Sequence, residues 1–199
     1  MKLLLFSDLH GDVAAAESLA ERSRNFDVVV GAGDFGNMRR GVEKCIHVLK
    51  NMTTPTVLVP GNNESAEELR RACDSWPQVH VLHGSGVTLF DVPFWGIGGG
   101  IPPTPFGDWS FDFSEEQAAP LLQDCPLGAV LVSHSPPQGA VDRSSSGQNL
   151  GSVAVRKTVL QKQPRLVVCG HVHACAGQSA TIGRTPVVNA GPKGIRWNL

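Results

Sequence analysis

The sequence has no excess charge of one sign, no long hydrophobic run and no paired-cysteine motif. Its 17 Lys and Arg residues nearly balance its 18 Asp and Glu residues, for a formal net charge of −1. The lack of an overall basic field disfavours a nucleic-acid partner and attraction to an anionic membrane surface, although a nuclease with local basic patches stays an alternative. No apolar stretch approaches the ~20 residues that a helix needs to cross a bilayer, so we also expect no membrane span.

The cysteine content is typical of free, mostly buried thiols in a reducing compartment. Five cysteines are present, an odd number, and no two of them form a CxxC pair. We also expect no secretory signal peptide, because the apolar run Leu3–Phe6 is interrupted too soon by Ser7–His10. We therefore expect a cytoplasmic protein.

What is present points to an α/β fold in a single domain over residues 1–199, since no repeat, linker or charge run divides the chain. Short apolar runs predict strands at residues 2–7, 27–32, 56–59, 129–132 and 166–169. Helical spacing predicts helices at residues 13–24, 39–51, 65–73, 114–124 and 150–162. This alternation favours a largely parallel sheet, with two or three further strands near residues 176–182, 185–189 and 194–198.

Metal-compatible side chains directly follow five of the predicted strands. In chain order they are Asp8, His10, Asp34, Asn62, His134, His171 and His173. The carboxyl ends of strands in an open α/β sheet converge on one crevice, so we expect these side chains to meet there. The spacings Asp-x-His and His-x-His would place both side chains on the same side of an extended segment.

The residue types indicate which ligand this crevice holds. Carboxylate, amide and imidazole without thiolate suit manganese, iron, zinc or cobalt better than calcium, and disfavour a structural zinc site. Seven ligands are too many for one four-coordinate ion, so we predict two divalent ions that share a carboxylate, about 3.5–4 Å apart. Manganese is the expected metal, with iron, zinc, cobalt or nickel as alternatives.

Each of these residues alone has a simpler explanation. An aspartate after a strand, such as Asp8, is usually a helix cap, an asparagine after glycine, such as Asn62, is usually a turn residue, and an isolated histidine is usually structural. These explanations would have to coincide at five successive strand ends, which favours the metal site. Three histidines lie outside the pattern and are expected at the surface or in packing: His47, His80 and His83.

The motifs, in their order, resemble those of the calcineurin-like metallophosphoesterase superfamily. The family pattern D-x-H, G-D, G-N-H-[DE], H and G-H-x-H is matched by Asp8–His10, Gly33–Asp34, Gly61–Glu64, His134 and Gly170–His173. Two further segments are similar to a subgroup of small, phosphodiesterase-like members: Gly107–Phe111 and Ser133–Pro137. The resemblance implies a two-sheet β-sandwich flanked by helices, a four-layer αββα fold.

The resemblance also implies how the ligands divide and what they do. One ion would be held by Asp8, His10 and His173, and the other by Asn62, His134 and His171, with Asp34 bridging them. The implied reaction is hydrolysis of phosphodiesters or small phosphomonoesters through a hydroxide that bridges the ions. The expected partner is a small phosphate-ester substrate, and the oligomeric state stays open.

Asn63 departs from the family pattern, which has a histidine there that is thought to assist the leaving oxygen. An asparagine can donate a hydrogen bond but delivers no proton at neutral pH, and loss of general-acid help costs roughly 10²–10⁴-fold in rate. We therefore assign Asn63 to the catalytic position and expect weak turnover that favours good leaving groups, unless His83 or Asp12 supplies the proton. The alternative is a catalytically impaired binding or scaffold protein with the same fold.

The Gly- and Pro-rich loop over residues 98–111 is expected to form a wall of the substrate site. Its aromatic residues Phe106, Trp109 and Phe111 could stack on an aromatic leaving group or base, or could simply pack the loop onto the sheet. Three basic residues are candidates for phosphate contacts: Arg143, Arg184 and Lys193.

Overall fold

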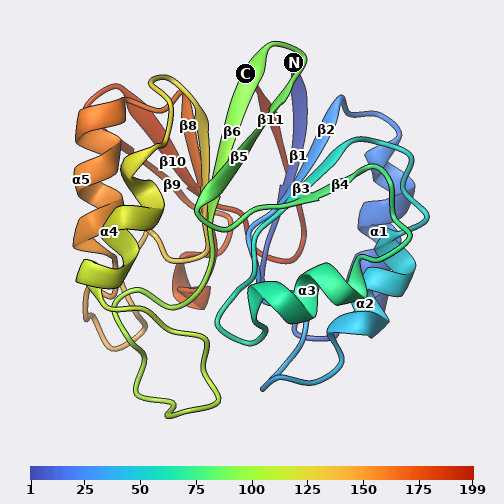
Figure 1. Cartoon of the computed structure of the whole chain (residues 1–199), viewed down its shortest axis with the longest axis horizontal. Helices are drawn as coiled ribbons and strands as arrows, with labels where there is room; N and C mark the ends of the chain where they lie inside the picture. Colours follow the sequence, from blue (N-terminus) through green and yellow to red (C-terminus); the bar gives the residue numbers. More distant parts are fainter.

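The computed structural model describes residues 1–199 and shows two mixed β-sheets packed face to face, with five α-helices on their outer sides (Figure 1). This confirms the expected four-layer sandwich. The largely parallel pairing that the strand rhythm favoured is also present, in two sheets that each have a parallel centre and at least one antiparallel edge.

The first sheet has the strand order β11-β1-β2-β3-β4. Its parallel strands are β1 (Lys2–Phe6), β2 (Val28–Gly31), β3 (Thr56–Leu58) and β4 (Val79–Val81). The last strand of the chain, β11 (Ile195–Asn198), pairs antiparallel with β1.

The second sheet has the order β5-β6-β7-β8-β10-β9. Its parallel centre consists of β6 (Val92–Ile97), β7 (Val130–Ser133), β8 (Leu166–Cys169) and β10 (Thr185–Asn189). The antiparallel edge strands are β5 (Ser85–Leu89) and β9 (Ser179–Ile182). A short 3-10 turn, His173–Cys175, precedes β9, so this strand starts later than the sequence predicted.

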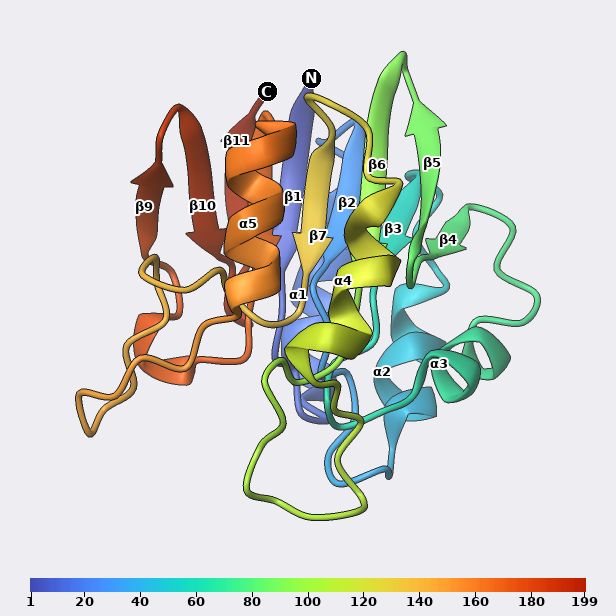
Figure 2. The same cartoon turned by 60° about the vertical axis from the view of Figure 1, so that its left-hand side comes forward.

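All five predicted helices are present, each within a few residues of its expected bounds. The first sheet is covered by α1 (Val13–Ser23), α2 (Val42–Leu49) and α3 (Ala66–Ala72), and the second by α4 (Glu115–Gln123) and α5 (Val153–Lys162) (Figure 2). The α2 helix begins three residues late because Gly41 precedes it with φ +75°, outside the helical range. None of the helices combines the length and hydrophobicity needed to cross a bilayer.

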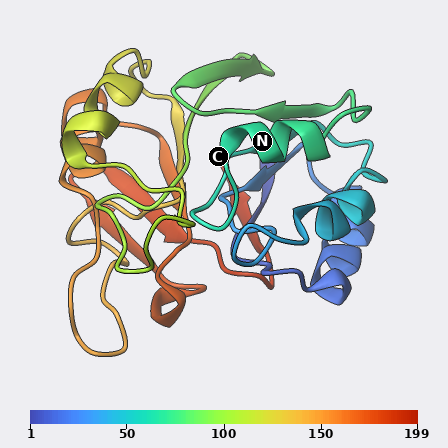
Figure 3. The same cartoon turned by 60° about the horizontal axis from the view of Figure 1, so that its bottom comes forward.

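The continuous apolar character of the central strands follows from burial on both faces. In β1, Leu3 and Leu5 face the second sheet, whereas Leu4 and Phe6 pack against the helices of the first sheet. The side chains of a strand alternate between its faces, so a strand between two packed layers needs an apolar residue at every position. The carboxyl ends of the parallel strands carry loops that gather at the lower edge of the molecule in Figure 1, which Figure 3 turns toward the reader.

Candidate metal centre

The loops after β1 and β2 run side by side beyond the ends of their strands. The backbone N–H of Asp8 donates to Gly33 O at 2.9 Å, and that of His10 donates to Asp34 O at 2.9 Å. Asp8, His10 and Asp34 have φ values of 57°, 46° and 59°, a conformation that residues other than glycine rarely adopt. The Asp-x-His segment is therefore tightly turned, and the prediction that an extended segment aligns its side chains was wrong.

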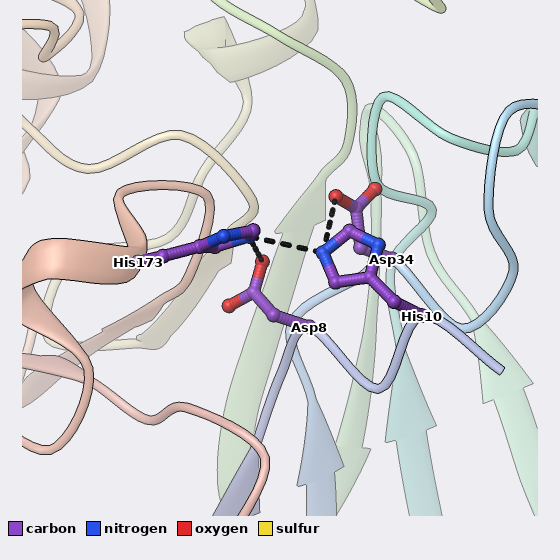
Figure 4. A group of neighbouring side chains, drawn as sticks. All are labelled: Asp8, His10, Asp34 and His173. Atoms are coloured by element: carbon purple, nitrogen blue, oxygen red, sulfur yellow. Dashed lines mark hydrogen bonds and ion pairs between the residues drawn. The ribbon is translucent and has the colours of Figure 1, made fainter. Parts of the chain in front are cut away.

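Four of the predicted ligands form one group, drawn in Figure 4: Asp8, His10, Asp34 and His173. One donor atom from each lies within 4.8 Å of all the others. The His10 Nε2 atom is 2.9 Å from His173 Nε2 and 3.6 Å from Asp34 Oδ2, and His173 Nε2 is 3.7 Å from Asp8 Oδ1. The carboxylates are buried, whereas the His173 side chain is 62% exposed, so this group is open to solvent on the His173 side.

The other three predicted ligands form a second group next to Asp34. The Asn62 Oδ1 atom lies 3.2 Å from His134 Nε2 and 3.1 Å from His171 Nδ1. The His134 Nε2 atom is also 3.5 Å from Asp34 Oδ1. One oxygen of Asp34 therefore faces the first group and the other faces the second, and all seven predicted ligands are brought together.

The hydrogen bond from His134 to Ala32 leaves three acceptor atoms of this second group facing one another with no hydrogen between them. Its Nδ1 lies 2.7 Å from Ala32 O, and a carbonyl only accepts, so Nδ1 carries the hydrogen. In the neutral imidazole Nε2 is then an acceptor, and it faces two further acceptors, Asn62 Oδ1 and Asp34 Oδ1. Three hydrogen-bond acceptors that converge in a buried place suit a cation. The lone pairs of this nitrogen and these two oxygens therefore fit a divalent metal ion.

A family model described as the calcineurin-like phosphoesterase superfamily domain matches residues 1–198. This chain belongs to the calcineurin-like phosphoesterase superfamily. A UPF0046 protein of Caenorhabditis elegans is 28% identical over 113 residues, which cover 55% of this chain and 26% of that relative. This chain thus spans only part of that curated relative's length.

Several solved structures share the superfamily fold at low sequence identity. Protein TT1561 of Thermus thermophilus superposes with a TM-score of 0.77 at 20% identity, covering 96% of this chain and 90% of that one. Phosphopantetheinyl hydrolase of Mycobacterium tuberculosis gives a TM-score of 0.65 at 16% identity, with coverage of 96% and 88%. A dimetal phosphatase of Danio rerio gives 0.63 at 15% identity, with coverage of 95% and 86%.

The electrostatics of the two groups of side chains favour a bound cation. Burial alone would raise the pKa of Asp34, but His134 and His10 hold it below its ordinary value. Burial and the neighbouring His134 lower the pKa of His171 to about 3, which keeps that imidazole neutral. Burial opposes protonation of His134, yet Asp34 and Asp8 raise its pKa, because the surrounding carboxylates favour positive charge at this position.

Glu64 holds the loops that carry Asp34 and Asn62. Its carboxylate accepts hydrogen bonds from the backbone N–H groups of Asp34 at 2.8 Å, Gly61 at 2.7 Å and Gly36 at 3.1 Å. Burial and the charge of Asp34 raise the pKa of Glu64 to about 7. The sequence showed Glu64 as the last position of a motif but not its role. That role depends on partners about 30 residues earlier in the chain.

Asn63 lies beside the shared carboxylate. Its Nδ2 donates to Asp34 Oδ2 at 2.7 Å, its backbone N–H donates to Asp34 Oδ1 at 2.9 Å, and its Oδ1 accepts from the Met38 N–H at 2.8 Å. The residue is only 6% exposed. The asparagine at the departure from the family pattern is therefore bound to the centre of the site.

The alternative proton donors have other roles in the structure. Asp12 caps α1 by accepting from the Ala15 N–H at 3.0 Å. His83 accepts from the Gly98 N–H through Nδ1 at 3.1 Å, and burial together with Arg70 lowers its pKa to about 4. An imidazole with that pKa is neutral near pH 7, so it is a poor general acid.

The loop between β6 and α4 borders the two groups of side chains, since the Phe111 N–H donates to Asn62 O at 2.9 Å, and its role as a wall of a substrate site stays a prediction. Phe106 is 54% exposed and stacks on Trp109 with ring centroids 5.7 Å apart, whereas Phe111 packs against Phe113 at 4.8 Å. Of the three aromatic residues singled out in the sequence, Phe111 thus packs the loop, and Phe106 with Trp109 presents a surface to solvent. The sequence missed Arg39, whose Nη1 donates to Trp109 O at 3.2 Å and joins this loop to the one after β2.

One predicted phosphate contact is wrong. Arg184 lies in the turn between β9 and β10, where β10 begins. Because β10 runs parallel to β8, that turn lies at the end of the sheet opposite the loop with His171 and His173. Arg143 and Lys193 stay predictions.

Proposed function

We propose that this chain is a metal-dependent phosphoesterase that hydrolyses phosphodiesters or small phosphomonoesters. The observation that carries the proposal is the position of Asp34, with one carboxylate oxygen toward each of two ligand groups. In this proposal Asp8, His10 and His173 hold one ion, Asn62, His134 and His171 hold the other, and Asp34 serves both. Manganese is the proposed metal.

Two divalent cations bound there would neutralise phosphate charge and lower the pKa of a bound water to near neutrality. The residues of the chain set the geometry for this chemistry. The His134 Nδ1–H bond to Ala32 O fixes the tautomer and the ring orientation, and Glu64 ties the Asp34 and Asn62 loops together. Phosphoryl transfer depends largely on such positioning and on electrostatic stabilisation.

The leaving group is where this chain differs from the family pattern. Asn63 can donate a hydrogen bond near Asp34 but has no proton to transfer at neutral pH. We therefore propose slow turnover with a preference for leaving groups that need no protonation, such as nitrophenolate. Phe106, which is exposed and stacks on the half-buried Trp109, offers a stacking surface for an aromatic leaving group.

We further propose that residues 1–199 act as one domain in the cytoplasm on small phosphate esters and not on nucleic acid. The family match over residues 1–198 and the core shared by both sheets support a single unit. The net charge of −1 supports small substrates over a polyanion.

The test is manganese-dependent hydrolysis of bis(p-nitrophenyl) phosphate by protein first stripped of metal. We expect nitrophenol release that rises with added manganese, is lost in Asp34→Asn and is retained in His47→Asn, a histidine on the exposed face of α2. Metal uptake without hydrolysis across a panel of mono- and diesters would contradict the enzyme. That result would favour the alternative, a binding or scaffold protein.

A further inference from the structure

The loop over residues 98–113 is bonded directly to Asn62, one of the proposed ligands. The backbone N–H of Phe111 donates to Asn62 O at 2.9 Å. The side-chain Nδ2 of Asn62 donates to Ser110 Oγ at 3.0 Å. One point of this loop therefore contacts both the main chain and the side chain of Asn62, 48 residues away in the sequence.

Asp112 determines the direction of the hydrogen bonds in this contact. Ser110 Oγ donates to Asp112 Oδ1 at 2.9 Å, and a carboxylate can only accept. A serine hydroxyl has one hydrogen, and Asp112 takes it, so Ser110 must accept from the Asn62 amide N–H. The amide nitrogen of Asn62 then faces Ser110, and its oxygen faces His134 and His171 at 3.2 and 3.1 Å.

Asp112 is itself fixed by Thr104. Both the backbone N–H and the hydroxyl of Thr104 bind Asp112 Oδ2, at 2.8 and 2.7 Å, and the Thr104 hydroxyl also lies 3.0 Å from Ser110 Oγ. With Oδ2 engaged in this way, Asp112 presents Oδ1 to Ser110. The bonds thus converge on the Asp112 carboxylate: Thr104 donates to one of its oxygens, and Asn62 donates to Ser110, which donates to the other.

We propose that Ser110 and Asp112 are positioning residues that orient the Asn62 amide with its oxygen toward the second ligand group. This inference rests on the proposed metal-dependent function. An asparagine binds a metal through its oxygen and not through its NH2 group, so a flipped Asn62 removes one ligand. The loop at the edge of the site would then also be part of the metal centre, and its position would govern affinity for the second ion.

The first test needs no metal. Nuclear Overhauser contacts of the Asn62 side-chain NH2 protons are measured in isotope-labelled protein. We expect contacts to the Ser110 β-protons and none to the His134 or His171 rings. In Asp112→Asn the new amide can donate to Ser110 Oγ, which frees the hydroxyl hydrogen for Asn62 and favours the flipped amide. Ring contacts in the unmodified protein, or an unchanged pattern in Asp112→Asn, would overturn the proposal.

The second test is calorimetric titration with manganese, using Asn62→Ala to identify the binding step that belongs to this group. Loss of an outer partner of a ligand lowers metal affinity by roughly 10–100-fold. We expect Ser110→Ala and Asp112→Asn to weaken that step by this factor and to leave the other within about twofold. Ser110→Thr retains the hydroxyl and should restore affinity. The control Asp108→Asn, an exposed acid in the same loop, should bind as the unmodified protein does.

Wild-type affinity for both ions in Ser110→Ala and Asp112→Asn, or equal weakening of both steps, would overturn the positioning role. Thermal unfolding without metal checks that the variants are folded. If the unmodified protein hydrolyses no ester but the amide contacts and the calorimetry agree with expectation, the proposed enzyme fails and the orientation of Asn62 stands. If hydrolysis is found and the amide contacts disagree with expectation, the proposed enzyme stands and the proposed orientation of Asn62 fails.

Discussion

At the scale of single residues, Asn63 is where this chain departs from the family pattern, and the proposed slow turnover depends on it. Its amide joins the Asp34 carboxylate to the Met38 backbone, and it cannot act as a general acid. Close packing surrounds this position. A Cβ added at Gly61 would overlap the Asp34 carboxylate, which is why the motif has glycine there.

We predict that Asn63→His raises the rate on poor leaving groups more than on good ones, because only a poor leaving group needs the proton that histidine can supply. The expected gain in kcat/KM is roughly tenfold or more for an alkyl phosphodiester, with little change for the bis-nitrophenyl ester. The measurement is the ratio of the two kcat/KM values, with Asn63→Gln as an amide control. Equal or reduced rates on both substrates would rule out the proposed role.

At the scale of secondary-structure elements, polar side chains from one element hold the start or end of another. Glu115 of α4 accepts from the Val153 N–H at 2.9 Å and the Ala154 N–H at 2.7 Å, and so caps the beginning of α5. In the same way, His83, in the turn between β4 and β5, accepts from the N–H of Gly98 just after β6. Such contacts link the elements in ways that hydrophobic periodicity does not show.

The His83 contact predicts how stability depends on pH. Burial and Arg70 lower the pKa of His83 to about 4 from an ordinary value of 6.5, so between these values the unfolded chain binds a proton that the folded chain does not. The stabilisation is complete above about pH 6.5 and is lost as the pH falls toward about 4. We expect the free energy of unfolding in urea to fall less between about pH 7 and about pH 5 in His83→Gln, which retains an acceptor but does not titrate.

The control for this measurement is His80→Gln, which leaves His83 in place and should retain the wild-type decline. Parallel declines in the wild-type protein and His83→Gln would show that the lowered pKa of His83 does not contribute.

At the scale of the whole molecule, the proposed metal centre joins the two sheets. Asp8, Asp34 and Asn62 follow strands of the first sheet, whereas His134 and the pair His171 and His173 follow strands of the second. An ion bound to residues from both sheets therefore binds the folded chain in preference to the unfolded one. Such an ion stabilises the fold by mass action.

We predict that manganese at about 100 times its dissociation constant stabilises the protein by about 2.7 kcal/mol per ion, equivalent to a rise of roughly 5–10 °C in Tm. His173→Asn should reduce this rise while leaving the Tm in a chelator nearly unchanged, because the His173 side chain is 62% exposed. His47→Asn should behave as the wild type. An identical rise in His173→Asn would exclude His173 as a ligand. The measurement is thermal denaturation followed by circular dichroism.

The sequence by itself determined the helices, the central strands and the seven residues that meet at the carboxyl ends of those strands. These features are local, since apolar spacing sets each element and the polar residues directly follow the strands. The same local argument failed for Asp8 and His10, whose turned backbone depends on bonds to the loop after β2. It also failed for Arg184, because the direction of β10 is set by its pairing with β8.

Only the tertiary structure decided how the strands divide into two sheets, that Asp34 lies between the two ligand groups, and that Ser110 contacts the Asn62 amide. Each of these depends on contacts between residues far apart in the chain, such as the 48-residue separation of Asn62 and Ser110. Sequence periodicity reports which face of an element is buried but not which partner covers it. The physical reason is that a hydrogen bond between distant residues depends on the packing of whole layers, which no short pattern encodes.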